Sequence, residues 1–94
     1  MLEVKRMIFI SLGRFKCRPT KDVTAKVDKL MEKMSKEGIK FIGGYWTLGR
    51  YDSVVIFEAP DEKTAMKVGL YVADIVAMQT LVAVPRKEAI KLVE

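Results

Sequence analysis

The sequence has 94 residues, 50% of them apolar, a formal net charge of +5, no histidine and a single cysteine, Cys17. This length allows one domain with a hydrophobic core, residues 1–94, and is too short for two. The lack of histidine excludes histidine-containing zinc sites, a catalytic triad with a histidine base and a histidine-ligated haem. We therefore expect no metal and no cofactor, and any acid–base chemistry would depend on carboxylates, Lys, Arg or Tyr.

The positive charge is concentrated in the first half of the chain. Residues 1–50 contain 12 Lys or Arg and 5 acids, whereas residues 51–94 contain 5 and 7. A basic half is compatible with nucleic-acid binding. Solvent-exposed lysines on one helix explain it equally simply, and we favour that interpretation.

Nothing in the sequence indicates a membrane protein. No window approaches the roughly 18 consecutive apolar residues of a membrane span, and the N-terminus leads into a strand-like segment without a signal-peptide core. We expect a soluble, cytoplasmic protein. The chain has no asparagine and only one glutamine, Gln79, which together with its abundant Lys and Glu suggests a thermophilic source.

The first half predicts a strand and then a helix. Residues 4–12 form an apolar run typical of a strand covered on both faces. Thr20 is the expected N-cap of a helix that ends at Glu37-Gly38. Its apolar residues recur at helical spacing and are Val23, Val27, Leu30, Met31 and Met34.

A β-hairpin is expected next. Its strands cover residues 39–48 and 51–58, with Gly49-Arg50 as a two-residue turn. Gly43 and Gly44 lie inside the first of these strands, which predicts a β-bulge or a close approach by another backbone or a ligand.

The second half repeats the alternation of helix and strand. Asp61 is the expected N-cap of a second helix, and residues 75–84 alternate as a fourth strand. Pro85 ends that strand, and residues 86–94 predict a short C-terminal helix.

This order, β-α-β-β-α-β, predicts an α+β protein of the ferredoxin-like type with a four-stranded antiparallel sheet. Right-handed crossovers place the first and third strands in the centre and both helices on one face. The third strand is nevertheless apolar on both faces at residues 54–57. A partner must then cover the second face, and a homodimer or higher oligomer that forms a barrel is the simplest arrangement.

The hairpin carries a family resemblance. Residues 45–52 read YWTLGRYD, and Gly49, Tyr51 and Asp52 resemble the Gly-x-Tyr-Asp signature of the GYD family. The resemblance extends over nearly the whole chain through the order of strands and helices. It implies a ferredoxin-like protomer of a dimeric α+β barrel, and it implies no particular reaction.

The candidate ligand-binding residues lie on this hairpin and are Tyr45, Trp46, Arg50, Tyr51 and Asp52. An Arg beside aromatic rings suits a carboxylate or enolate, and a desolvated Asp suits a general base. A structural interpretation is also open. In it Gly49 makes the turn, Asp52 pairs with backbone and with Arg50, and Trp46 belongs to the core.

Three functions therefore stay open: a binding protein for a small organic molecule, a cofactor-independent monooxygenase or isomerase, and a structural or regulatory module without catalysis. Binding of RNA through the sheet is disfavoured. In the third strand Asp52 and Val54 occupy positions where an RNA-recognition motif carries stacking aromatic residues.

Overall fold

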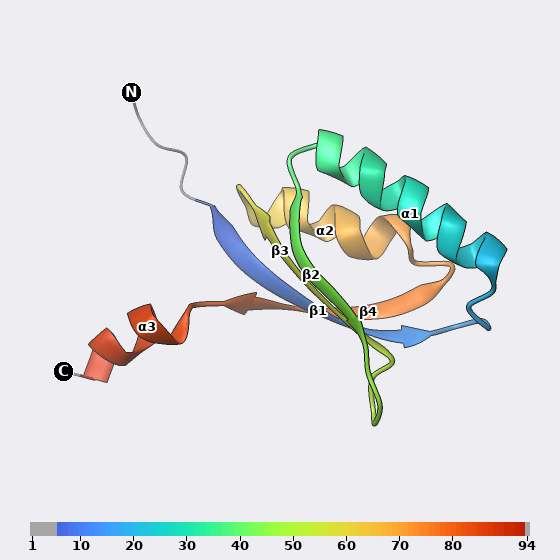
Figure 1. The fold of residues 1–94 in the computed structure, drawn as a ribbon. Helices are drawn as coiled ribbons and strands as arrows, with labels where there is room; N and C mark the ends of the chain where they lie inside the picture. The colour runs from blue at the N-terminus through green and yellow to red at the C-terminus, as the bar shows by residue number, and fades with distance from the viewer. Residues whose placement is uncertain (1–5, 94) are drawn as a thin grey trace.

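The computed structural model describes residues 6–93, and its strands and helices follow the predicted order (Figure 1). Val4, Lys5 and Glu94, which the predicted terminal elements included, lie outside the described residues. The elements are β1 Met7–Phe15, α1 Lys21–Lys36, β2 Lys40–Trp46, β3 Ser53–Ala59, α2 Glu62–Tyr71, β4 Val76–Ala83, α3 Arg86–Ala89 and a 3-10 helix Ile90–Val93.

The four strands form one antiparallel sheet in the order β2-β3-β1-β4, and α1 and α2 cover one of its faces (Figure 1). The predicted ferredoxin-like topology, with β1 and β3 in the centre, is confirmed. The predicted bulge is also confirmed. Phe41 is opposite Phe57 but Gly43 is opposite Ile56, so Ile42 is the extra residue of β2.

Both predicted helix caps are present. The Thr20 hydroxyl accepts a hydrogen bond from the Val23 amide at 3.2 Å, and the Asp61 carboxylate accepts one from the Thr64 amide at 2.8 Å. Each bond satisfies an amide that the first turn of a helix leaves unpaired. Gly38 follows α1 with φ of 101°, the conformation for which glycine was expected there.

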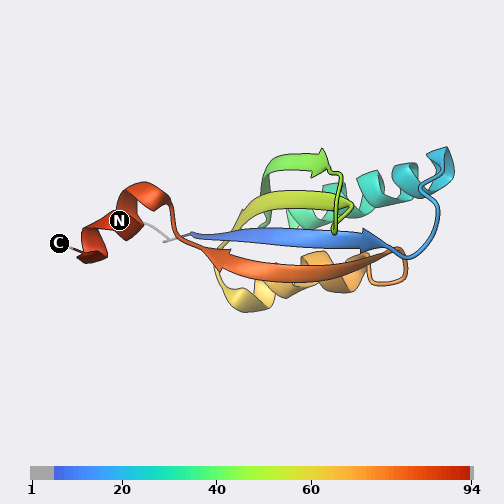
Figure 2. The same ribbon diagram turned by 90° about the horizontal axis from the view of Figure 1, so that it is seen from below.

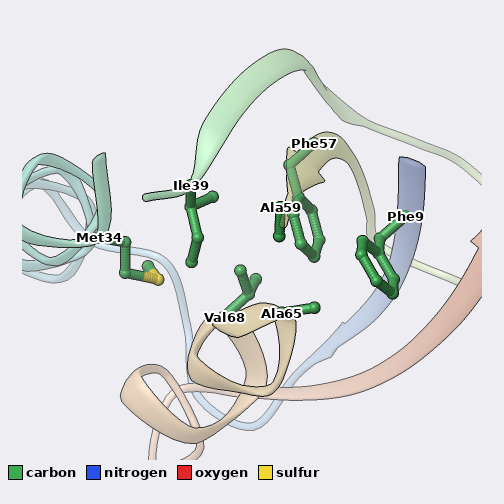
Figure 3. Close-up of a cluster of buried hydrophobic side chains, with 7 residues drawn as sticks. All are labelled: Phe9, Met34, Ile39, Phe57, Ala59, Ala65 and Val68. Carbon is green, nitrogen blue, oxygen red and sulfur yellow. The ribbon is translucent and has the colours of Figure 1, made fainter. Parts of the chain in front are cut away.

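The core lies between the two helices and the central strands (Figure 3). Phe9 and Phe57 stack with their ring centroids 5.4 Å apart, and Met34 approaches from the end of α1. The buried cluster is completed by Ile39, Ala59, Ala65 and Val68. This cluster is the filled end of the layer between helices and sheet.

Within residues 6–93 the other face of the sheet carries no helix. Ile10 lies opposite Ile56 on one side and Leu81 on the other. Directly opposed residues in neighbouring strands point to the same face, so these three side chains form an apolar strip. Phe9 and Phe57 point to the opposite, helix-covered face, because successive residues of a strand alternate. The face of the sheet that carries this strip is named the open face below.

The C-terminal segment extends away from the sheet. Figures 1 and 2 both place α3 beyond the end of β4, clear of α1 and α2. Leu92 and Val93 are 83% and 86% exposed. No helix in the described part of the chain has the length and apolar character needed to cross a membrane.

Candidate functional site

The connection between β2 and β3 is longer than predicted. The strands end at Trp46 and begin again at Ser53, so a two-residue turn at Gly49-Arg50 is wrong. The loop is closed at its base by the Thr47 amide, which donates to the Asp52 carbonyl at 2.8 Å, while the Thr47 hydroxyl donates to the Tyr51 carbonyl at 2.7 Å. Gly49 has φ of 98° at the loop tip, where a residue with a side chain would be strained.

Asp52 fastens this loop to the end of β1. Its backbone amide donates to the Gly13 carbonyl at 2.8 Å, and its carboxylate accepts a hydrogen bond from the Phe15 amide at 2.8 Å. Gly13 has no room for a side chain, since an added Cβ would lie 2.4 Å from the Ser53 hydroxyl oxygen. The expected pairing of Asp52 with backbone is confirmed, and its partner is the neighbouring strand β1.

Tyr51 and Arg50 also make contacts, though Arg50 does not pair with Asp52. The Tyr51 hydroxyl donates to the side-chain oxygen of Gln79 on β4 at 2.7 Å. The Arg50 guanidinium lies over the Tyr51 ring, 5.8 Å from its centroid. Within residues 6–93 the ion pairs join Arg6 to Glu58 and Lys67 to Glu37, so the expected Arg50–Asp52 pair is not formed.

Trp46 is not a core residue. Its side chain is 66% exposed, and its ring meets Phe15 edge-on with the centroids 5.5 Å apart. An edge-to-face contact is a favoured geometry for two aromatic rings. Tyr45 is similarly exposed. The expectation that Trp46 fills the core is therefore wrong.

A cavity of about 400 Å³ opens between α1 and the helix-covered face of the sheet. Of the five candidate residues, Tyr45 and Trp46 line this cavity, whereas Arg50, Tyr51 and Asp52 do not. The cavity thus lies on the helix-covered side of the sheet, opposite the face that a partner was expected to cover. Its remaining wall consists of Phe15, Cys17, Pro19, Val23, Thr24, Val27, Asp28, Met31, Gly44, Ser53, Val55, Val72, Ile75, Val76 and Met78.

The wall of the cavity is mostly apolar. Ser53 supplies a buried hydroxyl, Cys17 an exposed thiol and Asp28 an exposed carboxylate. The Thr24 hydroxyl is already used, because it donates to the Lys21 carbonyl at 2.9 Å. No group of three or more His, Cys, Asp or Glu that could hold a metal ion occurs among the described residues. This chemistry suits an apolar molecule with few polar groups.

Sequence reasoning missed most of the wall. Val23, Val27 and Met31 were predicted to share one face of the helix, and they line the cavity together, but helical spacing does not reveal that the space beneath them is empty. One feature of the sequence does indicate empty space between α1 and the sheet. Gly44 and Ser53 are small residues on strands whose other inward positions hold Phe41 and Phe57.

A cluster of charged and polar side chains lies outside the cavity, between α1 and α2. One carboxylate oxygen of Glu37 accepts hydrogen bonds from the Tyr71 hydroxyl at 2.6 Å and the Lys67 ammonium at 3.0 Å. These bonds hold the pKa of Glu37 below its ordinary value. The same bonds raise the pKa values of Tyr71 and Lys67. This cluster connects the two helices at the filled end.

Comparison with known proteins gives structural likenesses and a family match. The crystal structure of SnoaB, a cofactor-independent oxygenase from Streptomyces nogalater, aligns with 84% of this chain and 91% of its own, with a TM-score of 0.49 and 8% sequence identity. Among curated proteins no match is found. The family model of the GYD domain matches residues 9–93, which is nearly the whole chain. The chain therefore belongs to the GYD domain family.

Proposed function

We propose that this protein binds a small, largely apolar organic molecule in the cavity between α1 and the sheet. The observation that carries the proposal is the cavity itself, about 400 Å³ in volume with an apolar wall. Pockets for small molecules in proteins typically measure about 300–1,000 Å³ and have this composition. Leaving such a space empty costs stability, because its walls lose packing contacts.

An exposed aromatic residue supports the same proposal. Trp46 lines the cavity, lies opposite Ser53 on the helix-covered face and is largely exposed to solvent, so it stands at the open side of the cavity. Tyr45 lies opposite Val54, and its ring lies beside Gly43 on the other face of the sheet. An aromatic side chain in the position of Trp46 offers a flat surface against which a bound ring can pack. Ser53 offers a hydrogen bond within the wall, which suits a ligand with one polar group. The proposal assigns binding and no reaction.

Titration with the uncharged aromatic probe N-phenyl-1-naphthylamine tests the proposal. Trp46 is the only tryptophan, so energy transfer from Trp46 to the probe reports binding near the cavity. Val27→Phe adds a ring inside the wall and is expected to weaken binding by more than about tenfold, which corresponds to 1.4 kcal/mol. Val84→Phe is the matched control, since Val84 is exposed and outside the wall.

Saturable binding to the wild-type chain and to Val84→Phe, with loss in Val27→Phe, is the expected result. Equal binding by Val27→Phe and the wild-type chain would place the probe elsewhere and contradict the proposal. A folded wild-type chain without saturable binding would contradict it as well.

The open face supports a second element of the proposal, a homodimer or higher oligomer. Ile10, Ile56 and Leu81 form an apolar strip on a sheet face without helices, and Leu92 and Val93 are exposed in the C-terminal segment. Partly exposed apolar side chains gathered on one face are typical of protein–protein contacts. Two copies that pack through their open faces would form the dimeric α+β barrel.

Light scattering at micromolar concentration tests the assembly. We expect at least twice the mass of the chain for the wild type and a shift towards monomer for Leu81→Lys, which places a charge on the open face. Leu48→Lys is the control, because Leu48 is fully exposed on the hairpin loop. A stable wild-type monomer would contradict the assembly and leave the cavity proposal intact.

A further inference from the structure

Asp52 joins three segments of backbone through its own atoms. Its carbonyl accepts from Thr47 at the end of β2, its amide donates to Gly13 of β1, and its carboxylate accepts from Phe15 at the last position of β1. Each bond measures 2.8 Å. Asp52 thereby sets the distance between the end of β1 and the end of β2, although it lines no part of the cavity.

Those two strand ends carry the aromatic residues at the open side of the cavity. Phe15 is bonded directly to Asp52, and Trp46 immediately precedes Thr47, which is bonded to Asp52 as well. Phe15 and Trp46 both line the cavity and touch each other edge-on. Beyond Phe15 the chain continues to Cys17 and Pro19, which form another part of the wall.

We propose that Asp52 is a positioning residue for the ligand site. It does not touch the ligand. It holds the Phe15–Trp46 pair, the aromatic mouth, at the open side of the cavity. This inference rests on the proposed binding function and assigns a task to the Asp of the Gly-x-Tyr-Asp signature.

The carboxylate suits this task for a physical reason. A hydrogen bond from a backbone amide to an ionised carboxylate is stronger than one between neutral groups. The Phe15 amide is partly buried, so removal of the acceptor leaves a donor that solvent pairs poorly. The end of β1 would then lose its fixed position, and Phe15 would no longer hold the largely exposed Trp46 ring in one orientation.

Tyr51 makes a contact of a different kind. Its hydroxyl reaches Gln79 of β4, and neither residue lines the cavity. This bond ties the loop to β4 without fixing the backbone of either aromatic residue of the mouth. Tyr51→Phe therefore serves as a nearby variant that removes a loop hydrogen bond but leaves the mouth in place.

The test compares Asp52→Ala, Asp52→Asn and Tyr51→Phe by two measurements. Near-ultraviolet circular dichroism reports the fixed environment of Trp46 in the absence of any ligand. Titration with N-phenyl-1-naphthylamine reports the site. Asp74→Ala is the matched control, because Asp74 is exposed and outside the cavity wall.

Asp52→Ala is expected to lose the tryptophan dichroism and to bind the probe about tenfold more weakly, as the loss of a charge-assisted hydrogen bond allows. Asp52→Asn retains a side-chain oxygen that can accept from Phe15, so it is expected to restore most of both signals. Tyr51→Phe and Asp74→Ala are expected to match the wild type within about twofold.

Unchanged dichroism and unchanged binding in folded Asp52→Ala would overturn the positioning role and leave the cavity proposal standing. Absence of probe binding by the wild-type chain would instead remove the proposed function, while the dichroism of Asp52→Ala would still decide whether Asp52 holds the mouth. If Asp52→Ala does not fold, Asp52→Glu replaces it. Its acceptor is displaced by one methylene, and the same losses are expected.

Discussion

The two ends of the layer between helices and sheet are packed differently. At the filled end Phe9, Met34 and Phe57 are almost completely buried against one another (Figure 3). At the other end α1 lies over a cavity of about 400 Å³, and Trp46, the largest side chain nearby, borders the cavity and stays largely exposed to solvent. The same two helices and the same sheet thus enclose a packed core and an empty space.

This difference separates stability from binding in one small fold. Large apolar side chains at the filled end provide the contacts that stabilise the chain, since burial and close packing dominate folding energetics. The end of the layer that contains the cavity is the hollow end. There Gly44, Ser53 and Val27 leave volume that a ligand can occupy. Substitutions at the two ends should therefore differ in what they change, and this expectation can be tested.

The largest effect is expected for Phe57→Ala at the filled end. Phe57 is 0% exposed and contacts the rings of Phe9 and Phe41. Truncation of a buried Phe typically lowers the free energy of unfolding by about 3–5 kcal/mol. Urea unfolding followed by circular dichroism measures it. Leu48→Ala, at an exposed site, should remain within about 0.5 kcal/mol of the wild type.

Val68→Ala and Val27→Ala compare the two ends with one and the same substitution. Both valines lie on helices, so the change in helix propensity is equal. Val68 is buried in the filled end, and its truncation is expected to cost about 2 kcal/mol as lost transfer energy plus a new void. Val27 already borders empty space and should cost less than about 1 kcal/mol.

The two valine variants can also contradict the proposal of a ligand-binding cavity. Equal losses in the two valine variants, measured by urea unfolding at the same protein concentration, would mean that the hollow end is packed as tightly as the filled end. The cavity would then collapse or be filled in solution, and the distinction between the two ends would be lost.

The fold could be predicted because local signals agreed with one another. Thr20 and Asp61 are hydrogen-bonding caps whose function depends on residues three positions away. Helical and strand periodicities gave the element order, and the rule on crossovers gave the strand order. The open face was likewise visible as a third strand that is apolar on both sides.

The site could be predicted only in part because its contacts are not local. Asp52 is hydrogen-bonded to Phe15, which is 37 positions away in the sequence. Tyr51 is hydrogen-bonded to Gln79, which is 28 positions away. Glycine supplies positive φ in short and long loops alike, so Gly49 did not give the length of the turn. Apolar periodicity shows which way a side chain points, and it does not show whether the space in front of it is filled.

The smallest effect on the free energy of unfolding is expected from Glu37→Gln. This substitution tests the contacts that hold the C-terminal end of α1. The C-terminal end of α1 is connected to α2 through Glu37, Lys67 and Tyr71, whereas the N-terminal end lies over the cavity and is capped by Thr20. The second carboxylate oxygen of Glu37 is buried and has no hydrogen-bond partner among the residues that the structure describes. Loss of the carboxylate should therefore loosen the filled end and leave the cavity unchanged.

The pH dependence identifies this contribution. The hydrogen bonds from Tyr71 and Lys67 lower the pKa of Glu37 in the folded chain below its ordinary value of 4.5. The stabilisation is therefore fully present above pH 4.5 and is lost as the pH falls through the lowered folded-state pKa. Tyr71 and Lys67 have raised pKa values, so their share is present below their ordinary values of 10.0 and 10.5 and is lost at higher pH.

Unfolding free energies measured between about pH 3 and pH 7 should fall less steeply towards acid for Glu37→Gln than for the wild type. Glu32→Gln is the matched control, because Glu32 is an exposed carboxylate on the same helix. Parallel curves for Glu37→Gln and the wild type would show that Glu37 does not carry the acid dependence. A changed affinity for N-phenyl-1-naphthylamine in Glu37→Gln would show that the two ends of the layer are coupled, because the only group altered lies at the filled end.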